Sequence, residues 1–337
     1  MNLDKLEEVL SSEPQYRIKQ VKFDLFQRLI SDWDQATTLP LSLREKLKKE
    51  FPLLLRAKTL ISKDQKTVKA LITFDDGLSV ESVLMRHNGR NTVCVSSQVG
   101  CPLACLFCAT GKMGFKRNLT SQEIIAQVLF FARYLKNFKP AGKVSNVVFM
   151  GMGEPLLNFE QVIGAIRILN DKNCFNLGAR KISLSTSGIA PGIKKLADLE
   201  LGINLAISLN AAEDKLRSKL MPINKKYPIK EVLKAVNFYI AKTNRKVMFE
   251  YLLISGVNDS LKQAEELSKI VRRNLYLVNL IRYNPTGKFK PSGRDQIEMF
   301  RELLEKKGVN VTQRFSFGQD IKAACGQLAT QETPAGL

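Results

Sequence analysis

A short cysteine-rich loop carries the strongest chemical signal in the sequence. Cys101, Cys105 and Cys108 follow the spacing Cys-x3-Cys-x2-Cys, and the aromatic Phe107 stands directly before the third cysteine. Three thiolates in one loop can bind three irons of a 4Fe–4S cluster and leave the fourth iron open to a small molecule. A structural zinc site needs four ligands, which Cys94 would complete. The spacing is unlike common zinc motifs, and it favours the iron–sulfur cluster.

Polar side chains at the ends of apolar runs are candidates for binding that small molecule. Gly153 and Glu154 belong to the segment GMGEP, which follows an apolar run. Glycine lets a ligand approach the backbone closely, and a carboxylate accepts hydrogen bonds from an ammonium group. Serine and asparagine more often cap helices or form turns, so each of the other candidates is weak by itself. Together they outline one ligand pocket, and they are Ser183, Ser185, Ser187, Ser208, Asn210 and Asn284.

These residues follow predicted strands that alternate with predicted helices. The predicted strands are 144–150, 181–186, 203–209, 246–254, 275–281 and 309–314. The predicted helices are 120–138, 159–171, 190–198, 228–243, 260–273 and 293–307. Regular alternation of this kind predicts an α/β fold with a parallel sheet, either barrel-like or doubly wound. In both architectures function gathers at the carboxyl ends of the strands.

The sequence before residue 91 has a different pattern. Residues 1–53 predict a small helical accessory domain, because apolar residues there recur at helical spacing. Residues 54–90 predict a short β extension, because alternating apolar runs are joined by turn sequences such as Asp-Asp-Gly and Asn-Gly. We predict the main domain at 91–320 and a C-terminal segment at 321–337, with a loose tail over its last ten residues.

Composition narrows the class of partner. The chain has 337 residues, and 52 lysines and arginines against 32 aspartates and glutamates give a formal net charge of +20. Such a charge attracts a polyanion, so nucleic acid is the leading partner, although a basic surface can also serve solubility alone. A single histidine, His87, argues against histidine metal centres and Ser/His/Asp triads.

The distribution of apolar residues and cysteines indicates a compartment. No run reaches the roughly 18 uncharged apolar residues of a membrane span, and the N-terminus lacks a signal-peptide pattern. We therefore expect a cytoplasmic protein that makes no membrane contact. Four of the six cysteines lie between residues 94 and 108, which suits metal or thiol chemistry better than a disulfide framework. Cys174, in the plain segment DKNCFN, is interpreted as an inert buried cysteine.

The cysteine loop resembles the signature of radical S-adenosylmethionine (SAM) proteins, Cys-x3-Cys-x-aromatic-Cys. Further blocks, which run in order from about residue 80 to 328, resemble the RlmN/Cfr family of RNA adenine methyltransferases. The blocks are CVSSQVGC, GFKRNLT, GMGEPLLN, STSGIAP, SKLMPINKKYPI, GVNDS, NLIRYNP and DIKAACGQL. The resemblance implies a partial (β/α)6 radical SAM barrel whose loop cysteines hold the cluster. It also implies SAM contacts from Gly153, Glu154, Ser185, Ser208, Leu209, Asn210 and Asn284.

The resemblance further implies a reaction in two stages that uses two SAM molecules per turnover. The first SAM methylates Cys325, and the second is cleaved at the cluster to a radical that abstracts hydrogen from the S-methyl group. The resulting carbon radical adds to the adenine ring. Cys94 then breaks the protein–RNA link by forming a disulfide with Cys325, and Glu81 matches the family's proton acceptor. Without the resemblance, Glu81 would be interpreted as an exposed strand carboxylate.

The family resemblance also suggests the substrate. It implies methylation of carbon-2 of an adenine in 23S ribosomal RNA, in some members also in tRNA, by a monomer with an electron donor such as flavodoxin. Methylation of carbon-8, the antibiotic-resistance activity, is the alternative within the family, and GMGEP favours carbon-2. Two alternatives outside it are a zinc-stabilised RNA-binding protein without catalysis and a radical SAM enzyme for a small molecule.

Two segments depart from the family pattern. Family members commonly have Ser-Leu-His where this chain has Ser208, Leu209 and Asn210, so an imidazole is replaced by an amide that cannot titrate. The segment RFSFGQD before Cys325 carries less charge than relatives often place there. We expect RNA phosphates to contact basic loop residues, which are Lys116, Arg117, Lys225, Lys226, Lys288, Lys290 and Arg294.

Overall fold

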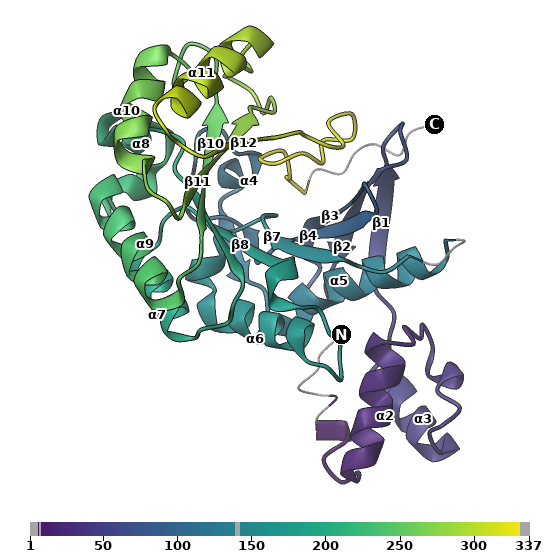
Figure 1. Ribbon diagram of the computed structural model, residues 1–337. Helices are drawn as coiled ribbons and strands as arrows, with labels where there is room; N and C mark the ends of the chain where they lie inside the picture. Colours follow the sequence, from purple (N-terminus) through teal and green to yellow (C-terminus); the bar gives the residue numbers. More distant parts are fainter. Residues whose placement is uncertain (1–5, 7, 139–141, 331–337) are drawn as a thin grey trace.

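A long mixed sheet forms the centre of the computed structural model, which describes residues 6, 8–138 and 142–330 (Figure 1). Its strands run in the order β1-β2-β3-β4-β7-β8-β9-β10-β11-β12. Their bounds are β1 (Arg56–Ile61), β2 (Thr67–Thr73), β3 (Ser79–His87), β4 (Arg90–Val95), β7 (Asn146–Phe149), β8 (Ile182–Thr186), β9 (Asn204–Ser208), β10 (Val247–Leu253), β11 (Tyr276–Arg282) and β12 (Val311–Arg314).

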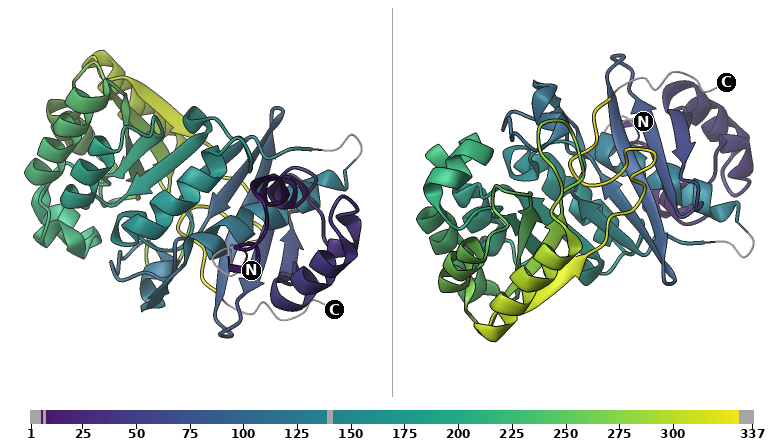
Figure 2. Two further views of the ribbon diagram at one scale, coloured as in Figure 1. Left: turned by 90° about the horizontal axis from the view of Figure 1, so that it is seen from below. Right: turned by 90° about the horizontal axis from the view of Figure 1, so that it is seen from above.

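Two pairing patterns divide the sheet. Strands β1 to β4 pair antiparallel, and every pair from β4 to β12 is parallel. Helices that connect the parallel strands cover one face of the curved sheet, while the C-terminal segment, yellow in Figures 1 and 2, crosses the other face. The connecting helices are α5 (Ser121–Lys136), α6 (Phe159–Asn170), α7 (Ala190–Asp198), α9 (Ile229–Thr243), α10 (Leu261–Val271) and α11 (Arg294–Lys306). The predicted parallel α/β fold is confirmed, in its barrel-like form.

Local sequence explains where these elements begin and which face they bury. Helix α5 starts at a capping box, in which the Thr120 side chain accepts a hydrogen bond from the Glu123 N–H and the Glu123 carboxylate accepts one from the Thr120 N–H. Helix α11 buries Ile297, Phe300 and Leu304, which recur at helical spacing and pack on the sheet. Strand interiors are largely apolar because helices and the C-terminal segment cover both faces.

The N-terminal third contains helices and an extension of the main sheet. Helices α2 (Gln15–Phe26) and α3 (Leu41–Glu50) flank the short η1 (Trp33–Gln35), where the Trp33 indole N–H donates to the Phe51 carbonyl at 2.7 Å. Strands β1 to β3 join the edge of the main sheet. Strand β1 was missing from the predicted runs because its residues are mostly exposed and do not alternate. The division at residues 53, 90 and 320 stays a prediction.

Short elements that the sequence did not predict surround the functional loops. Strands β5 (Gln98–Gly100) and β6 (Phe115–Asn118) form an antiparallel hairpin around the cysteine loop. The other short elements are α4 (Ala109–Lys112), α8 (Asp214–Leu220), η2 (Pro155–Leu157), η3 (Ala179–Lys181) and η4 (Pro222–Lys225). Within the described residues no helix has the length and apolar composition to cross a membrane. Most of the predicted C-terminal tail, residues 331–337, lies outside the described residues.

Candidate active site

The cysteine loop is held in shape by backbone hydrogen bonds. The Cys101 N–H donates to the Gly114 carbonyl at 2.9 Å and closes the base of the loop, and the Cys108 N–H donates to the Cys105 carbonyl at 3.1 Å. The Leu106 N–H donates to the Leu220 carbonyl at 3.0 Å, which ties the loop to α8. These contacts leave the thiol groups free to project from the loop, and none of the three cysteines is in a disulfide.

A large cavity at the carboxyl ends of the parallel strands brings most of the predicted site together. It holds about 980 Å³ of atom-free space, including the part open to solvent, which suits a small-molecule site. The predicted residues that line it are Cys101, Cys105, Cys108, Gly153, Glu154, Ser185, Ser187, Ser208, Asn210 and Cys325. Motifs that are more than 200 residues apart in sequence therefore face one space.

The three loop thiols fit an iron–sulfur cluster. Burial raises the pKa of the Cys101 thiol to about 12 and also holds the pKa of the Cys105 thiol well above its usual value. Such thiols ionise when a cationic centre binds them, because the metal supplies the missing counter-charge. In the part of the chain that the structure describes, no three His, Cys, Asp or Glu side chains converge tightly enough for a single metal ion. A cubane needs a wider spacing, since each thiolate binds a different iron.

The GMGEP segment is built around close backbone packing. A Cβ on Gly153 would lie 2.6 Å from the Gln98 Cβ, and the φ angle of Gly153 is +99°. The Gln98 side chain accepts a hydrogen bond from the Glu154 N–H at 2.8 Å. The predicted reason for the glycine was close approach of a ligand, but the structure adds close approach of the protein's own strand β5. Gly153 nevertheless lines the cavity.

Glu154 joins two strand ends at the cavity wall. Its carboxylate accepts hydrogen bonds from the Leu156 N–H at 3.0 Å and from the Ser187 N–H at 2.7 Å. Burial raises the pKa of Glu154, and the hydrogen bond from Ser187 opposes that shift. The carboxylate can accept further hydrogen bonds from a ligand ammonium group, because each of its oxygens has more than one lone pair.

Alanine in place of Gly153 is expected to destabilise the protein by about 2–4 kcal/mol, because overpacking adds to the strain of a left-handed backbone. Gly77 is the matched control, since its φ angle is +79° and a Cβ there would meet no atom within 4 Å. We expect Gly77→Ala to cost only about 1–2 kcal/mol. Urea unfolding of both variants measures the difference. Equal losses would show that crowding against Gln98 contributes nothing.

Arg217 is a structural centre that the sequence analysis missed. It is fully buried, and its guanidinium donates to the carbonyls of Leu209 at 3.0 Å, Ser187 at 2.7 Å and Ser208 at 3.2 Å. It also donates to the Asn224 side chain at 2.7 Å. The arginine thus fixes the ends of β8 and β9, which face the cavity. Nothing in the local sequence DKLRSKL distinguishes it, because its partners lie outside the helix, between 7 and 30 residues away.

Three of the predicted SAM contacts make interactions within the protein. The Asn210 side chain accepts a hydrogen bond from the Leu252 N–H at 2.9 Å, and its backbone is left-handed with a φ angle of +58°. Leu209 is buried and does not line the cavity. The Asn284 side chain donates to the Cys325 carbonyl at 3.1 Å, and it does not line the cavity either. Asn284 therefore positions the C-terminal cysteine in this structure.

The segment around Cys325 is bonded to the cysteine loop. The Ala109 N–H donates to the Gly326 carbonyl at 2.7 Å, and the Thr110 hydroxyl donates to the Leu328 carbonyl at 2.6 Å. Cys325 lines the large cavity and also a smaller adjacent one, which it shares with Cys94. Cys94 lines only the smaller cavity, whereas the three loop cysteines line the large one. Both cysteines are free thiols.

Arg314 and Glu250 add charge between the two cavities. The pKa of Arg314 is raised, because its electrostatic interaction with Cys325 outweighs the effect of burial, and Glu250 and Cys94 add to the rise. Burial raises the pKa of Cys94 to about 12, and Cys325 raises it further while Arg314 opposes the shift. Glu250 lines the large cavity and has one carboxylate oxygen without a hydrogen-bond partner. The Arg314 guanidinium therefore lies near both thiols.

Glu81 is buried, contrary to its interpretation as an exposed strand carboxylate. Its side chain is 3% exposed, and its carboxylate forms an ion pair with Lys69 at 2.8 Å. The other carboxylate oxygen accepts the Ala329 N–H at 2.9 Å. Glu81 thus binds the segment that follows Cys325, and the side chain is two residues from the pairing partner of Cys94 on β3, Val83.

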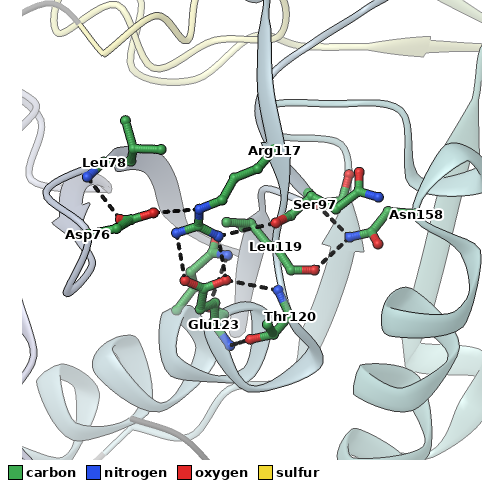
Figure 3. A network of polar contacts seen from close by, with 10 residues as sticks. Asp76, Leu78, Ser97, Arg117, Leu119, Thr120, Glu123 and Asn158 are labelled. Atoms are coloured by element: carbon green, nitrogen blue, oxygen red, sulfur yellow. Dashed lines mark hydrogen bonds and ion pairs between the residues drawn. The ribbon is translucent and has the colours of Figure 1, made fainter.

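Of the basic residues that were predicted to contact RNA, Arg117 is paired with carboxylates and the others are exposed. Arg117 lies between two carboxylates (Figure 3), donating to Asp76 at 2.6 Å and to both oxygens of Glu123 at 2.8 Å. Its charge is compensated, and it fixes β6 against α5, so the structure does not support a phosphate contact there. The other predicted residues are exposed, and they are Lys116, Lys225, Lys226, Lys288, Lys290 and Arg294.

Comparison with known proteins places this site in a family. A family model described as the Radical SAM superfamily matches residues 95–267. A probable dual-specificity RNA methyltransferase RlmN of Dictyoglomus turgidum is 45% identical over 318 residues, which cover 94% of this chain and 91% of that protein. The corresponding protein of Geobacillus kaustophilus is 44% identical, and the match covers 98% of this chain and 92% of that protein.

A solved structure of the same superfamily has the same fold. The crystal structure of a radical SAM methyltransferase from Sphaerobacter thermophilus is 44% identical and superposes with a TM-score of 0.92, and the match covers 97% of both chains. The similarity extends over the helical N-terminal part, the sheet and the C-terminal segment. The chain therefore belongs to the radical SAM superfamily and, within it, to the RlmN family.

Proposed function

We propose that this protein is an RNA methyltransferase that adds a methyl group to carbon-2 of an adenine in 23S ribosomal RNA, and of an adenine in tRNA, through S-methylcysteine at Cys325. The observation that carries the proposal is the shared cavity of the cysteine loop and Cys325. The relatives' description as dual-specificity RNA methyltransferases supports it, as does the formal charge of +20, which suits a polyanionic substrate. We also propose a cytoplasmic monomer served by an electron donor such as flavodoxin.

The residues of the chain have distinct tasks in this proposal. Cys101, Cys105 and Cys108 would hold the 4Fe–4S cluster, and Glu154 with the serines of β8 and β9 would orient SAM. When bound, the cluster and SAM would supply a radical that takes a hydrogen atom from the S-methyl group of Cys325, and the carbon radical left on that group can attack an electron-poor aromatic carbon that ordinary methyl transfer cannot reach. The cavity wall holds the reacting groups in register and excludes water.

Cys325 would carry the methyl group and Cys94 would release the product. The Cys325 sulfur would attack the SAM methyl group, and the Arg314 guanidinium lines the same cavity. Once the adduct has given up one electron to the redox chain that serves the cluster and one proton to Glu81, the Cys94 thiolate would attack the Cys325 sulfur. The sulfur–carbon bond then breaks with its electron pair on the carbon, which takes up a proton to complete the methyl group, and the reductant returns the transient disulfide to two thiols. Glu81 is the proposed proton acceptor, and a free lone pair of its carboxylate can take the proton beside the Lys69 ion pair and the Ala329 N–H hydrogen bond.

The test is turnover by the reconstituted protein. Protein purified without oxygen is incubated with SAM, a reductant and either a ribosomal RNA fragment or tRNA, and the nucleosides are separated by mass spectrometry. We expect 2-methyladenosine from both RNAs. The appearance of 8-methyladenosine would replace the proposed position by carbon-8. A colourless protein that contains zinc and binds RNA without modifying it would contradict the proposal.

A further inference from the structure

A third cavity, called the hollow here, adjoins the two cavities of Cys325 on the side of β12. It is lined by an exposed aromatic ring, by three arginines, one glutamate and one isoleucine, and by polar side chains; the residues are Arg282, Arg294, Ile297, Glu298, Gln313, Arg314, Phe315, Ser316 and Gln319. Arg314 lines this hollow and both cavities that contain Cys325. Phe315 lines the hollow and the smaller cavity that contains Cys94. A molecule bound in the hollow therefore contacts residues that also line the cavities of Cys325 and Cys94.

The charge of the hollow suits an anion. Arg282 and Arg294 are exposed, and neither forms an ion pair in the described part of the chain. The Arg282 guanidinium donates to the Ser292 carbonyl, which orients it and leaves further N–H groups free. Glu298 is the acidic residue of the hollow, and it is already paired with Arg301 on the same helix. The uncompensated charge of the hollow is thus positive.

Phe315, at the border of the hollow, is unusually exposed for an aromatic residue. It is 72% exposed, more than any other aromatic residue among the exposed large hydrophobic side chains. Phe317, two residues later, lies against the His87 ring with centroids 5.1 Å apart, so the backbone of this segment is braced. An exposed phenylalanine beside unpaired arginines is the combination with which proteins bind unstacked bases and their phosphates.

We infer that Phe315 stacks on a nucleotide next to the target adenine while Arg282 and Arg294 hold the adjoining phosphates. The inference rests on the proposed RNA substrate and deepens it. A base can reach the buried cavity only after it leaves its stack, and the neighbour that loses this stacking partner needs a replacement surface. The exposed ring of Phe315 in the segment RFSFGQD supplies it. Stacking is tolerant of base identity, which suits a protein that modifies both ribosomal RNA and tRNA.

The test uses a ribosomal RNA fragment with the fluorescent base 2-aminopurine placed at either position flanking the target adenine. We expect stacking on Phe315 to quench fluorescence at one of the two positions. In Phe315→Ala the quenching disappears, KM for the RNA rises by roughly 5- to 100-fold, and kcat at saturating RNA stays within about threefold. Phe315→Trp retains the quenching. The matched control is Phe238→Ala, because Phe238 is an exposed phenylalanine on the outer helix α9.

The arginines are tested by the salt dependence of binding. Arg282→Gln and Arg294→Gln should each reduce the slope of log K against log salt by roughly one unit, whereas Lys262→Gln on the outer face of α10 should leave it unchanged. Unaltered quenching in Phe315→Ala overturns the inference, whatever its KM. If that variant behaves as wild type and methylates RNA, only the stacking role fails; if wild type neither binds nor methylates RNA, the proposed function fails first.

Discussion

Cys325→Ala is expected to lose methyl transfer to RNA, by at least about 1000-fold, as removal of a covalent nucleophile commonly does. The variant should keep the fold of the segment, because the hydrogen bonds that hold it use backbone atoms of Cys325, Gly326 and Leu328. The loss therefore reflects the missing thiol. Single-turnover incubation with SAM labelled in its methyl group measures it, both as label on the protein and as label on RNA.

The same preparation separates this result from loss of the cluster. Cys325→Ala should remain brown with absorbance near about 400 nm, as expected for a thiolate-bound iron–sulfur cluster. Cys174→Ala is the matched control, because Cys174 is 3% exposed and contacts Asp171 outside both cavities. It should methylate RNA at the wild-type rate. Methylation by Cys325→Ala at that rate would show that Cys325 does not carry the methyl group.

The features that sequence reasoning predicted depend on short segments. Apolar runs alternate with amphipathic helices, and each run predicts a strand without knowledge of its neighbours. The cysteine loop is likewise readable because its three donors lie between residues 101 and 108. The carboxyl ends of parallel strands share one edge, so Gly153, Ser185 and Ser208 could be placed in one pocket before any contact was known.

The contacts that were missed join residues from distant segments. Arg217 binds the Ser187 carbonyl, which lies 30 residues before it, and Arg117 was assigned to RNA because Asp76 lies 41 residues away. The ion pair between Glu81 and Lys69 was also missed. Both lie on neighbouring antiparallel strands, where Lys69 pairs with Val83 and Leu71 with Glu81. The register of that hairpin brings the two charges together diagonally, but a single sequence does not fix the register.

Breaking the ion pair between Glu81 and Lys69 is expected to lower both stability and methylation. Glu81→Gln removes the charge that compensates Lys69, whose side chain is only 9% exposed. An unpaired buried ammonium group costs about 3–5 kcal/mol, so urea unfolding should show a loss of that size. The variant also lacks the proposed proton acceptor. In single-turnover reactions we therefore expect the covalent protein–RNA adduct to accumulate while methylated RNA stays near background.

A double variant distinguishes the two consequences. In Glu81→Gln combined with Lys69→Met, no buried charge remains unpaired, and replacement of a buried ion pair by neutral groups is often close to neutral in stability. The double variant should therefore recover most of the free energy of unfolding, and the glutamine oxygen can still accept the Ala329 N–H. It should not recover methylation, because neither side chain can take up the proton. Recovery of both stability and methylation would make Glu81 a structural residue and would require another proton acceptor beside Cys94.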